Sequence, residues 1–286
     1  GHPLAPGPLT AETLVSAICC ACRTRRAAYT LQRTERADQT MREILYGRQP
    51  VRETFRAGRR QVFKPLLAAG TQPAGIVDEI VSLARQARLP VQEVDRRELD
   101  RLGGEANHQG VAAEVSGYPY VDLETLLKAA QQAGEPPFLL LLDHVQDPQN
   151  LGSLLRSAEA AGVHGVVLPG RRATGVTPAA VRASAGAAEH VRVAQVTNLV
   201  QAMQALKARN LWLAGLEARP EAQLYSEANL GGALGIIVGS EGQGLARLVR
   251  DTCDFLLRLP MYGQVSSLNA GAAGAVALYE ARRQRG

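Results

Sequence analysis

The stretch Leu234-Gly-Ile-Ile-Val-Gly-Ser-Glu-Gly-Gln-Gly-Leu245 carries the strongest structural signal in the chain, together with a second stretch, Leu259-Pro-Met-Tyr-Gly-Gln-Val-Ser-Ser-Leu-Asn-Ala270. In each, an apolar run stops abruptly at glycine and small polar residues. This pattern predicts a buried parallel strand that runs into a loop. Because open α/β sheets bind ligands at the carboxyl ends of their strands, the two loops predict a pocket built mainly from backbone groups.

Upstream of these stretches, strands and helices alternate. The continuous apolar run Phe138-Leu-Leu-Leu-Leu-Asp143 predicts a strand buried on both faces. Asp147 or Asn150 can cap the helix that follows, with Arg156 about 1.7 turns beyond Asn150. Further strands are expected at 163–169, 191–196 and 211–216, and helices at 177–186, 199–208 and 268–283. Such alternation predicts a mostly parallel sheet with helices on both faces.

The part of the chain from Met41 to about Ser116 shows a smaller α/β pattern. Residues 43–47 lead into an amphipathic stretch at 50–57. Strands are expected at 61–67, 91–94 and 110–115, with helices at 76–87 and 96–104. Pro65 predicts that its strand lies at a sheet edge or is shortened. The expected organisation is an N-terminal extension (1–40), a small α/β domain (41–118), a linker (119–137) and a larger α/β domain (138–286).

Composition indicates a globular protein with no membrane association. The chain has 286 residues, of which 46% are hydrophobic and 21% charged, and no apolar run approaches the roughly 18 residues of a membrane span. The net charge of +5 permits a nucleic-acid partner. Arginine dominates, with 29 Arg against 3 Lys, which suits bidentate phosphate binding but also follows from a GC-rich coding sequence.

The first 40 residues differ from the rest of the chain. Gly1-His2 resembles a tag-cleavage scar, and we expect the native protein to begin near Met41. Basic residues follow the apolar run at 14–22, which is the wrong order for a secretory signal. Cys19, Cys20 and Cys22 lack zinc-ligand spacing, so no metal or disulfide framework is expected, and a reducing cytoplasm fits best.

Two further features of the small domain allow a structural and a functional interpretation. The basic cluster is either a solvated face or a contact surface for RNA phosphates; its members are Arg52, Arg56, Arg59, Arg60 and Lys64. His108, at the start of an expected strand, has either a structural or a functional role; its position in the small domain favours an RNA-facing function over a catalytic one.

Several chemistries are excluded by spacing. Gly239, Gly242 and Gly244 do not fit the dinucleotide-binding pattern, and no Walker A lysine or nucleophile elbow occurs. No cluster of His, Asp, Glu and Cys has metal-ligand spacing. A glycine-lined cofactor pocket remains, with an arginine, a glutamate and an asparagine in adjacent positions.

Three motifs in the C-terminal half resemble those of the SpoU (TrmH-type) RNA 2′-O-methyltransferases of the SPOUT superfamily. They are Asn150-x-Gly152-x-x-x-Arg156, Gly239-Ser-Glu-Gly-x-Gly244 and Leu259-Pro-Met-x-Gly-x-Val-x-Ser-Leu-Asn269. The front half, with Ile44-Leu-Tyr-Gly47 and His108-Gln-Gly110, resembles the L30e-like substrate domain of this family. The arrangement is most similar to the RlmB branch, which methylates a guanosine ribose in large-subunit rRNA.

The resemblance implies a SPOUT α/β trefoil-knot domain, which general rules of chain topology would not predict. It also implies an obligate homodimer and the cofactor S-adenosylmethionine. The residues implied in cofactor binding are Gly239, Leu259, Met261 and Leu268, and those implied in catalysis are Arg156, Asn150, Glu241, Ser267 and Asn269. The chain carries Ala270-Gly271 where the family usually has Val-Ser, and we expect looser packing of the last helix there.

The resemblance further implies particular roles for these residues. Arg156 is often given the role of general base, but a permanently charged guanidinium is better suited to binding phosphate and stabilising a developing alkoxide. Asn150 and Glu241 would position Arg156 and the ribose, and Ser267 and Asn269 would complete the pocket. Two other functions stay open, a tRNA ribose 2′-O-methyltransferase and a catalytically silent RNA-binding protein of ribosome assembly.

Overall fold

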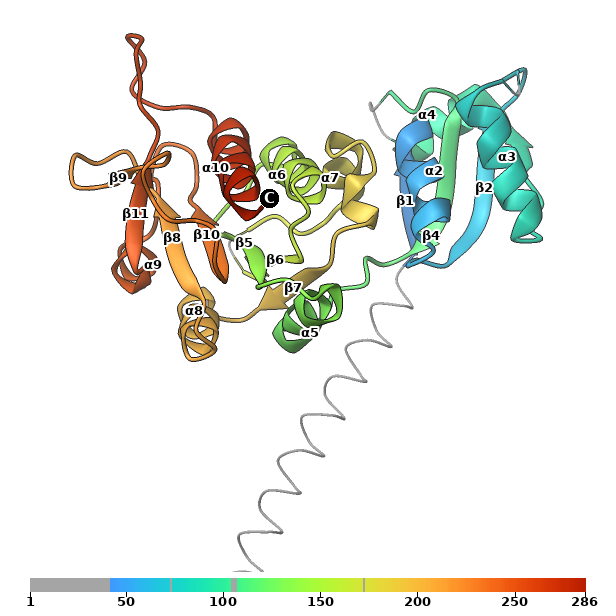
Figure 1. The fold of residues 1–286 in the computed structure, drawn as a ribbon. Coiled ribbons are helices and arrows are strands. Elements are labelled where there is room, and N and C mark those ends of the chain that lie inside the picture. Colours follow the sequence, from blue (N-terminus) through green and yellow to red (C-terminus); the bar gives the residue numbers. More distant parts are fainter. Residues whose placement is uncertain (1–41, 73, 104–106, 172) are drawn as a thin grey trace, which may run out of the picture.

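The computed structural model describes residues 42–72, 74–103, 107–171 and 173–286, which form two lobes, each with its own sheet (Figure 1). The expected N-terminal extension and its cysteines lie outside the described residues. No helix within the described ranges is long and apolar enough to cross a membrane.

The small lobe is built on a four-stranded sheet in the order β1-β4-β2-β3. Its elements are β1 (Arg42–Tyr46), α2 (Arg48–Ala57), β2 (Val62–Ala68), α3 (Ile76–Gln86), β3 (Gln92–Val94), α4 (Arg96–Gly103) and β4 (Val111–Ser116). The pairs β1–β4 and β4–β2 are antiparallel, and β2–β3 is parallel. Each predicted strand and helix of this region is present, with ends shifted by a few residues.

Pro65 lies inside a seven-residue strand, so the prediction of a shortened strand is wrong. The prediction that this strand lies at a sheet edge holds only around Pro65. β2 pairs with β4 at Pro65, whereas its pairing with β3 begins one residue later, at Leu66. Because β2 has a neighbour on only one side at Pro65, the missing N–H group breaks no ladder there.

The large lobe is built on a parallel seven-stranded sheet in the order β7-β6-β5-β10-β8-β11-β9. Its strands are β5 (Phe138–Leu142), β6 (Gly165–Pro169), β7 (Val193–Val196), β8 (Trp212–Leu216), β9 (Gln223–Leu224), β10 (Leu234–Val238) and β11 (Phe255–Arg258). β5 and β10 are buried at every position, as their uninterrupted apolar sequences predict. The strand expected from Leu259 onward is wrong: β11 ends at Arg258, and residues 259–269 form the loop.

Helices cover both faces of this sheet, with α6, α7 and α10 on one face and α5, α8 and α9 on the other (Figure 1). They are α5 (Leu123–Ala133), α6 (Pro148–Ala160), α7 (Pro178–Ala183), α8 (Leu199–Lys207), α9 (Arg247–Thr252) and α10 (Ala270–Arg285), together with the short 3₁₀ helix η1 (Ala187–Glu189). α5, inside the expected linker, packs its buried Leu126 on the core of this lobe.

Glycines allow α6 to lie very close to its neighbours. A methyl group on Gly152 of α6 would meet the backbone of α7, 2.8 Å from the carbonyl oxygen of Ala180. A methyl group on Gly271 of α10 would lie 2.7 Å from the Ser153 hydroxyl oxygen of α6. The looser packing expected at Gly271 is therefore not found, because Ser153 fills the space in front of it.

The two lobes are joined by a buried polar interface. The Arg60 side chain is fully buried and forms ion pairs with Glu43 of its own lobe and, at 3.2 Å, with Glu189 of the large lobe. Arg59 donates hydrogen bonds to the carbonyl oxygens of Glu189 and Val191. Neither interpretation of the basic cluster holds for these two arginines, because they are neither solvated nor free for RNA.

Two more groups strengthen this interface. The buried Tyr118 hydroxyl donates to the carbonyl oxygens of Ala188, at 2.9 Å, and Val191, at 2.6 Å. Burial raises the pKa of Tyr118, so the phenol stays protonated and remains a donor. Burial also raises the pKa of Glu189, and the nearby Arg60 guanidinium opposes this rise. The interface between the lobes is thus stabilised by charged groups that would lose their partners if the two lobes separated.

Replacing Arg60 by alanine is expected to destabilise the protein by about 3–5 kcal/mol, because Glu189 would be left buried without its partner. The change should be measured as a shift in the urea-unfolding midpoint. Arg42→Ala is the matched control, since Arg42 pairs with Glu114 while its own side chain is 60% exposed. It should cost less than about 1 kcal/mol. Equal losses in the two variants would contradict the buried interface.

Candidate active site

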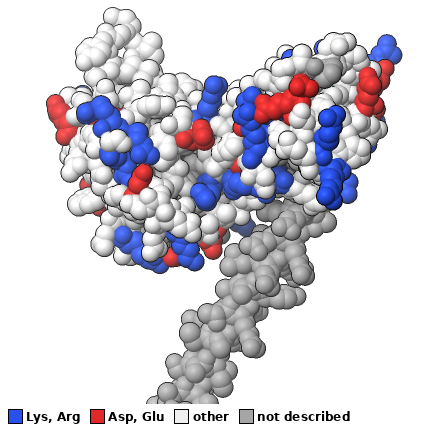
Figure 2. Space-filling model, turned by 45° about the vertical axis from the view of Figure 1, so that its right-hand side comes forward, with Lys and Arg blue, Asp and Glu red and all other residues white. Residues whose placement is uncertain are grey.

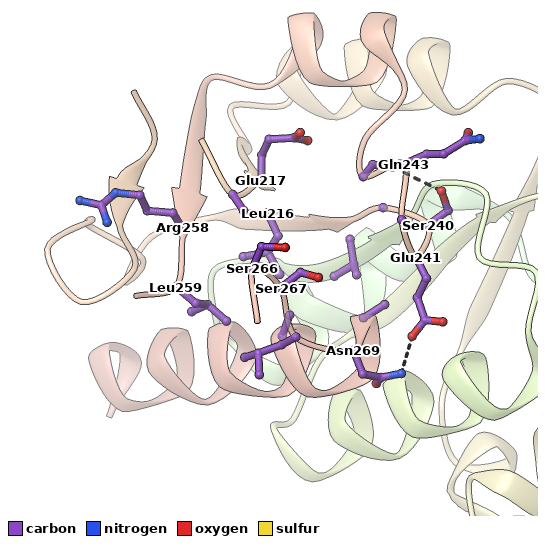
Figure 3. A pocket seen from close by; sticks show the side chains of 18 of the residues that line it. Leu216, Glu217, Ser240, Glu241, Gln243, Arg258, Leu259, Ser266, Ser267 and Asn269 are labelled. Atoms are coloured by element: carbon purple, nitrogen blue, oxygen red, sulfur yellow. Dashed lines mark hydrogen bonds between the residues drawn. The ribbon is translucent and has the colours of Figure 1, made fainter. Parts of the chain in front are cut away.

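A cavity of about 530 Å³ lies at the carboxyl ends of β8, β10 and β11, which are neighbours in the sheet. Cavities of about 300–1,000 Å³ are typical of small-molecule sites. Three segments line it (Figure 3), namely residues 216–218 after β8, residues 238–244 after β10, and residues 257–273 with gaps, from β11 to the start of α10. The loops after β10 and β11 are the two that the sequence predicts to form a pocket.

Gly239 shapes the wall of the cavity. A methyl group on Gly239 would collide with the backbone of Gly244 and would lie 2.7 Å from the nitrogen of Leu245. Ser240 and Gly244 exchange backbone hydrogen bonds of 3.2 and 3.0 Å, so the loop folds back tightly on itself. The glycine at 239 therefore permits a close approach of two backbone segments rather than a special backbone angle.

All four residues expected to bind the cofactor line this cavity: Gly239, Leu259, Met261 and Leu268. Of the residues expected in catalysis, Glu241, Ser267 and Asn269 also line it. Asn150 is 7% exposed and reaches the cavity wall through its bond to Asn269. The structure thus brings eight of the nine expected residues together.

Asn269 is the central polar residue of this group. Its side-chain oxygen accepts hydrogen bonds from the backbone nitrogens of Gly271 and Ala272, which caps α10. The cap directs the amide nitrogen away from the helix, where it donates to Asn150 Oδ1 at 2.7 Å and to Glu241 Oε1. Figure 3 shows Glu241 and Asn269 pointing toward each other. Every hydrogen-bonding group of the amide is therefore used.

Arg156 stands apart from this network. It lies on α6 and is exposed, and it does not line the cavity. Among the described residues it has no hydrogen-bond or ion-pair partner. The expected contact of Asn150 and Glu241 with Arg156 is absent from these residues, and Asn269 connects the two instead.

The sequence interpretation missed two carboxylates that hold the glycine-rich loop in place. Glu217, directly after β8, lines the cavity and accepts a hydrogen bond from the backbone nitrogen of Leu245 at 3.2 Å. The buried Asp143, directly after β5, accepts one from Ala246 at 2.7 Å. Both acids could have been found from the sequence, because each directly follows a predicted buried strand, at the carboxyl-terminal edge of the sheet where ligands bind.

His108 is structural, as one of the two interpretations has it. It is 3% exposed, its Nδ1 atom accepts from the backbone of Gly110 at 3.0 Å, and its Nε2 atom lies 2.9 Å from Asp100. Within the described part of the chain, no group of His, Cys, Asp and Glu could hold a metal ion.

Comparison with known proteins shows the family to which this chain belongs. Residues 137–279 match the SpoU rRNA methylase family, and residues 44–121 match the substrate-binding domain of RNA 2′-O ribose methyltransferases. YacO of Bacillus subtilis, assigned to the TrmH family of tRNA/rRNA methyltransferases, is 41% identical over 85% of this chain and 96% of its own length. A TrmH-family relative from Staphylococcus aureus is 42% identical, also over 85% of this chain and 96% of its own.

Solved structures agree with this. The SpoU methyltransferase AviRb from Streptomyces viridochromogenes, in complex with AdoMet, is similar with a TM-score of 0.70 and 26% identity, over 87% of this chain and 92% of that one. An RNA 2′-O ribose methyltransferase gives a TM-score of 0.70 and 27% identity, over 88% and 91%. The chain therefore belongs to the SpoU/TrmH family, and it is an S-adenosylmethionine-dependent RNA 2′-O-methyltransferase.

The cavity suits this cofactor in size and in the backbone groups exposed along its glycine-rich wall. Apolar side chains from Leu216, Leu259 and Leu268 offer surfaces for an adenine ring and a methionine chain. Backbone N–H and C=O groups of residues 241–243 are available for its polar atoms, because Ser240 and Gly244 use theirs to hydrogen-bond each other. We propose that the cofactor binds in this cavity.

Replacing Asn269 by serine is expected to separate its two tasks. The hydroxyl still caps α10, so stability should change by less than about 0.5 kcal/mol, whereas alanine should cost about 1 kcal/mol. Both variants lose the bonds to Asn150 and Glu241, and methyl transfer should fall by about 10–100-fold. Thermal unfolding and single-turnover rates check the two effects. A serine variant with full activity would contradict the role of the amide nitrogen.

Proposed function

We propose that this protein methylates the ribose 2′-oxygen of a guanosine in large-subunit (23S) rRNA, in the cytoplasm, as enzymes of the RlmB type do. Residues 138–286 form the knotted catalytic domain, residues 41–118 the RNA-binding domain and residues 119–137 the linker. The observation that carries the proposal is the Asn150–Asn269–Glu241 network at the wall of the cofactor cavity, in a lobe to which a substrate-binding lobe is fixed by buried ion pairs.

The reaction moves one methyl group from sulfur to the ribose 2′-oxygen, and the hydroxyl proton leaves. S-adenosylmethionine supplies a methyl group on a positively charged sulfur, which is a strong electrophile. The protein has to hold the 2′-oxygen in line with that methyl group, and alignment alone gives a large rate gain. We assign the proton to Glu241, whose second carboxylate oxygen has no partner among the described residues.

Arg156 binds the phosphate beside the target ribose in this proposal. A guanidinium is not neutral at any pH that a folded protein tolerates, so it cannot serve as a base. It can form two parallel hydrogen bonds to a phosphate and can stabilise the negative charge that develops on the 2′-oxygen. It is exposed and has no partner in the part of the chain that the structure describes, so its side chain can take on this task.

A homodimer is part of the proposal. Large apolar side chains are exposed in the loop after β11 and on α10, namely Met261, Tyr262, Val265, Leu268, Val276 and Tyr279. This loop extends away from the body of the large lobe (Figure 1). A second copy that covers this surface would also shield the cofactor cavity, which the same loop lines, and could complete the site beside Arg156.

Ribosomal RNA is preferred to tRNA because the small lobe offers a second, distant contact surface that suits a large folded RNA. Figure 2 shows Lys and Arg side chains gathered where the two lobes meet. A tRNA substrate remains the alternative, since the relatives carry both names. The intact network around Asn269 argues against a catalytically silent binding protein.

The test is methyl transfer from labelled S-adenosylmethionine to protein-free large-subunit rRNA, small-subunit rRNA and tRNA, with mass mapping of the product. The proposal predicts one 2′-O-methylguanosine in large-subunit rRNA. Label on tRNA alone would overturn the proposal of an rRNA substrate but would still support ribose 2′-O-methylation as the reaction. If no free RNA is labelled, a large-subunit assembly particle should be the next substrate, and failure there would overturn the proposal.

A further inference from the structure

A second cavity, of about 880 Å³, lies in the small lobe, outside the site described above. It is open to solvent at the ends of β2 and β4, beside the first residues of α2, α3 and α4. Arg48 and Arg96 are the charged residues that line it, and no described lining residue is acidic. The remaining lining is made of small residues, one isoleucine, and the polar side chains of Gln49, Thr71, Gln72 and Gln109.

Arg48 is held in place by a residue with an unusual backbone. Its Nε atom donates to the carbonyl oxygen of Gln109 and its backbone nitrogen donates to Gln109 Oε1, both at 3.2 Å. Gln109 has a φ of +54°, a left-handed conformation that is uncommon for residues other than glycine. Such local strain occurs preferentially at functional sites. The anchoring leaves the terminal nitrogens of Arg48 free to bind a ligand.

Arg96 adds a second free positive charge. It is exposed and has no hydrogen-bond or ion-pair partner among the described residues. α2, α3 and α4 begin at Arg48, Ile76 and Arg96, so the positive ends of three helix dipoles adjoin the cavity as well. The arginine charge and the helix dipoles both favour the binding of an anion in this cavity.

Glycine keeps the floor of the cavity open. Gly110 has a φ of +77°, and a methyl group on it would lie 2.9 Å from the Thr71 hydroxyl oxygen. Ala69, Gly70 and Ala74 are exposed and add little bulk. The space is therefore much larger than an isolated phosphate requires.

We propose that this cavity binds one unstacked nucleotide of the RNA substrate, with its phosphate on Arg48 and Arg96 and its base in the space above Gly110. Unpaired bases are commonly bound on guanidinium planes and by hydrogen bonds to their edges, and the side-chain amide nitrogens of Gln49, Gln72 and Gln109 can donate such bonds. The inference rests on the proposed function in taking RNA as the substrate, and it does not depend on which RNA that is.

Equilibrium binding of labelled large-subunit rRNA and of tRNA, at one fixed salt concentration, tests the inference with the full chain. Arg96→Gln removes a charge, and Ala69→Trp fills the cavity without changing charge. Each should raise the Kd of the better-bound RNA by about tenfold. Arg97→Gln is the matched control, because Arg97 is the exposed neighbour on the same helix and does not line the cavity; its Kd should change less than about twofold.

Competition by mononucleotides and the stability of the variants distinguish a nucleotide site from a simple anion site and from a loss of folding. Guanosine or uridine monophosphate should compete with the RNA, and inorganic phosphate at the same concentration should not. Equal competition by phosphate would reduce the cavity to an anion site and overturn the inference. An unchanged Kd in both cavity variants, with the melting temperature and S-adenosylmethionine affinity retained, would also overturn it. If the wild-type protein methylates tRNA, the proposal of an rRNA substrate fails. The proposed nucleotide site is then still tested, because the Kd values of the cavity variants are compared on tRNA.

Discussion

Replacing Arg156 by alanine is expected to lower the single-turnover rate of methyl transfer by about 10²–10³-fold. The guanidinium is the one positive charge among the expected catalytic residues, and no other residue of that group can stabilise a developing oxyanion by charge. The effect should fall on the chemical step and on RNA affinity. The affinity for S-adenosylmethionine should stay the same, because Arg156 does not line the cofactor cavity.

The same variant should fold normally. Arg156 is exposed and makes no described hydrogen bond or ion pair, so its removal should shift the unfolding free energy by less than about 0.5 kcal/mol. Arg209→Ala is the matched control: Arg209 is another exposed arginine, located before β8 and therefore at the opposite end of that strand from the cavity. Methyl transfer by the Arg156 variant at the rate of the Arg209 variant would refute the assigned role.

Replacing Gly239 by alanine is expected to raise the Kd for S-adenosylmethionine by more than about 100-fold. The added methyl group would meet the backbone of Gly244 and Leu245, and a backbone segment cannot rotate away as a side chain can. The loop between residues 239 and 244 would have to open, which would deform the cavity wall. Overpacking of this kind also costs about 1–3 kcal/mol of stability.

Calorimetric titration with S-adenosylmethionine measures this effect, with unfolding followed in parallel. Gly232→Ala is the matched control, because it precedes β10 at the end of the strand away from the cavity and a methyl group there would meet nothing within 4 Å. The control should bind the cofactor as the wild type does. A Gly239 variant with unchanged affinity would show that the cofactor does not depend on the close backbone approach in this loop.

Much of the large lobe follows from local sequence patterns. β5 and β10 are continuous apolar runs, so their burial in the centre of a parallel sheet was predictable. The loop after β10 was predictable for the same reason, because glycine and small polar residues end the run. Asn269 was identified as a site residue from its motif, and the structure adds that it caps α10 and that the cap directs its amide nitrogen at Asn150 and Glu241.

The features that were missed depend on contacts between distant residues. Arg59 and Arg60 lie in a run of basic residues, and a run by itself does not reveal that Glu189, more than 100 positions away, neutralises one of them. Glu217 follows a strand of ordinary appearance, and its bond to Leu245 forms only because β8 and β10 are neighbours. Pro65 was judged from its strand alone, although the extent of β3 decides whether it disturbs the sheet.

A crystal structure of the protein with S-adenosylmethionine would show whether the cavity between β8, β10 and β11 is the site of methyl transfer. We expect the cofactor in contact with Gly239, Leu259 and Leu268, with its methyl group facing the Asn150–Asn269–Glu241 network. Cofactor bound elsewhere in the chain, or bound with its methyl group directed away from that network, would exclude this cavity as the site of methyl transfer.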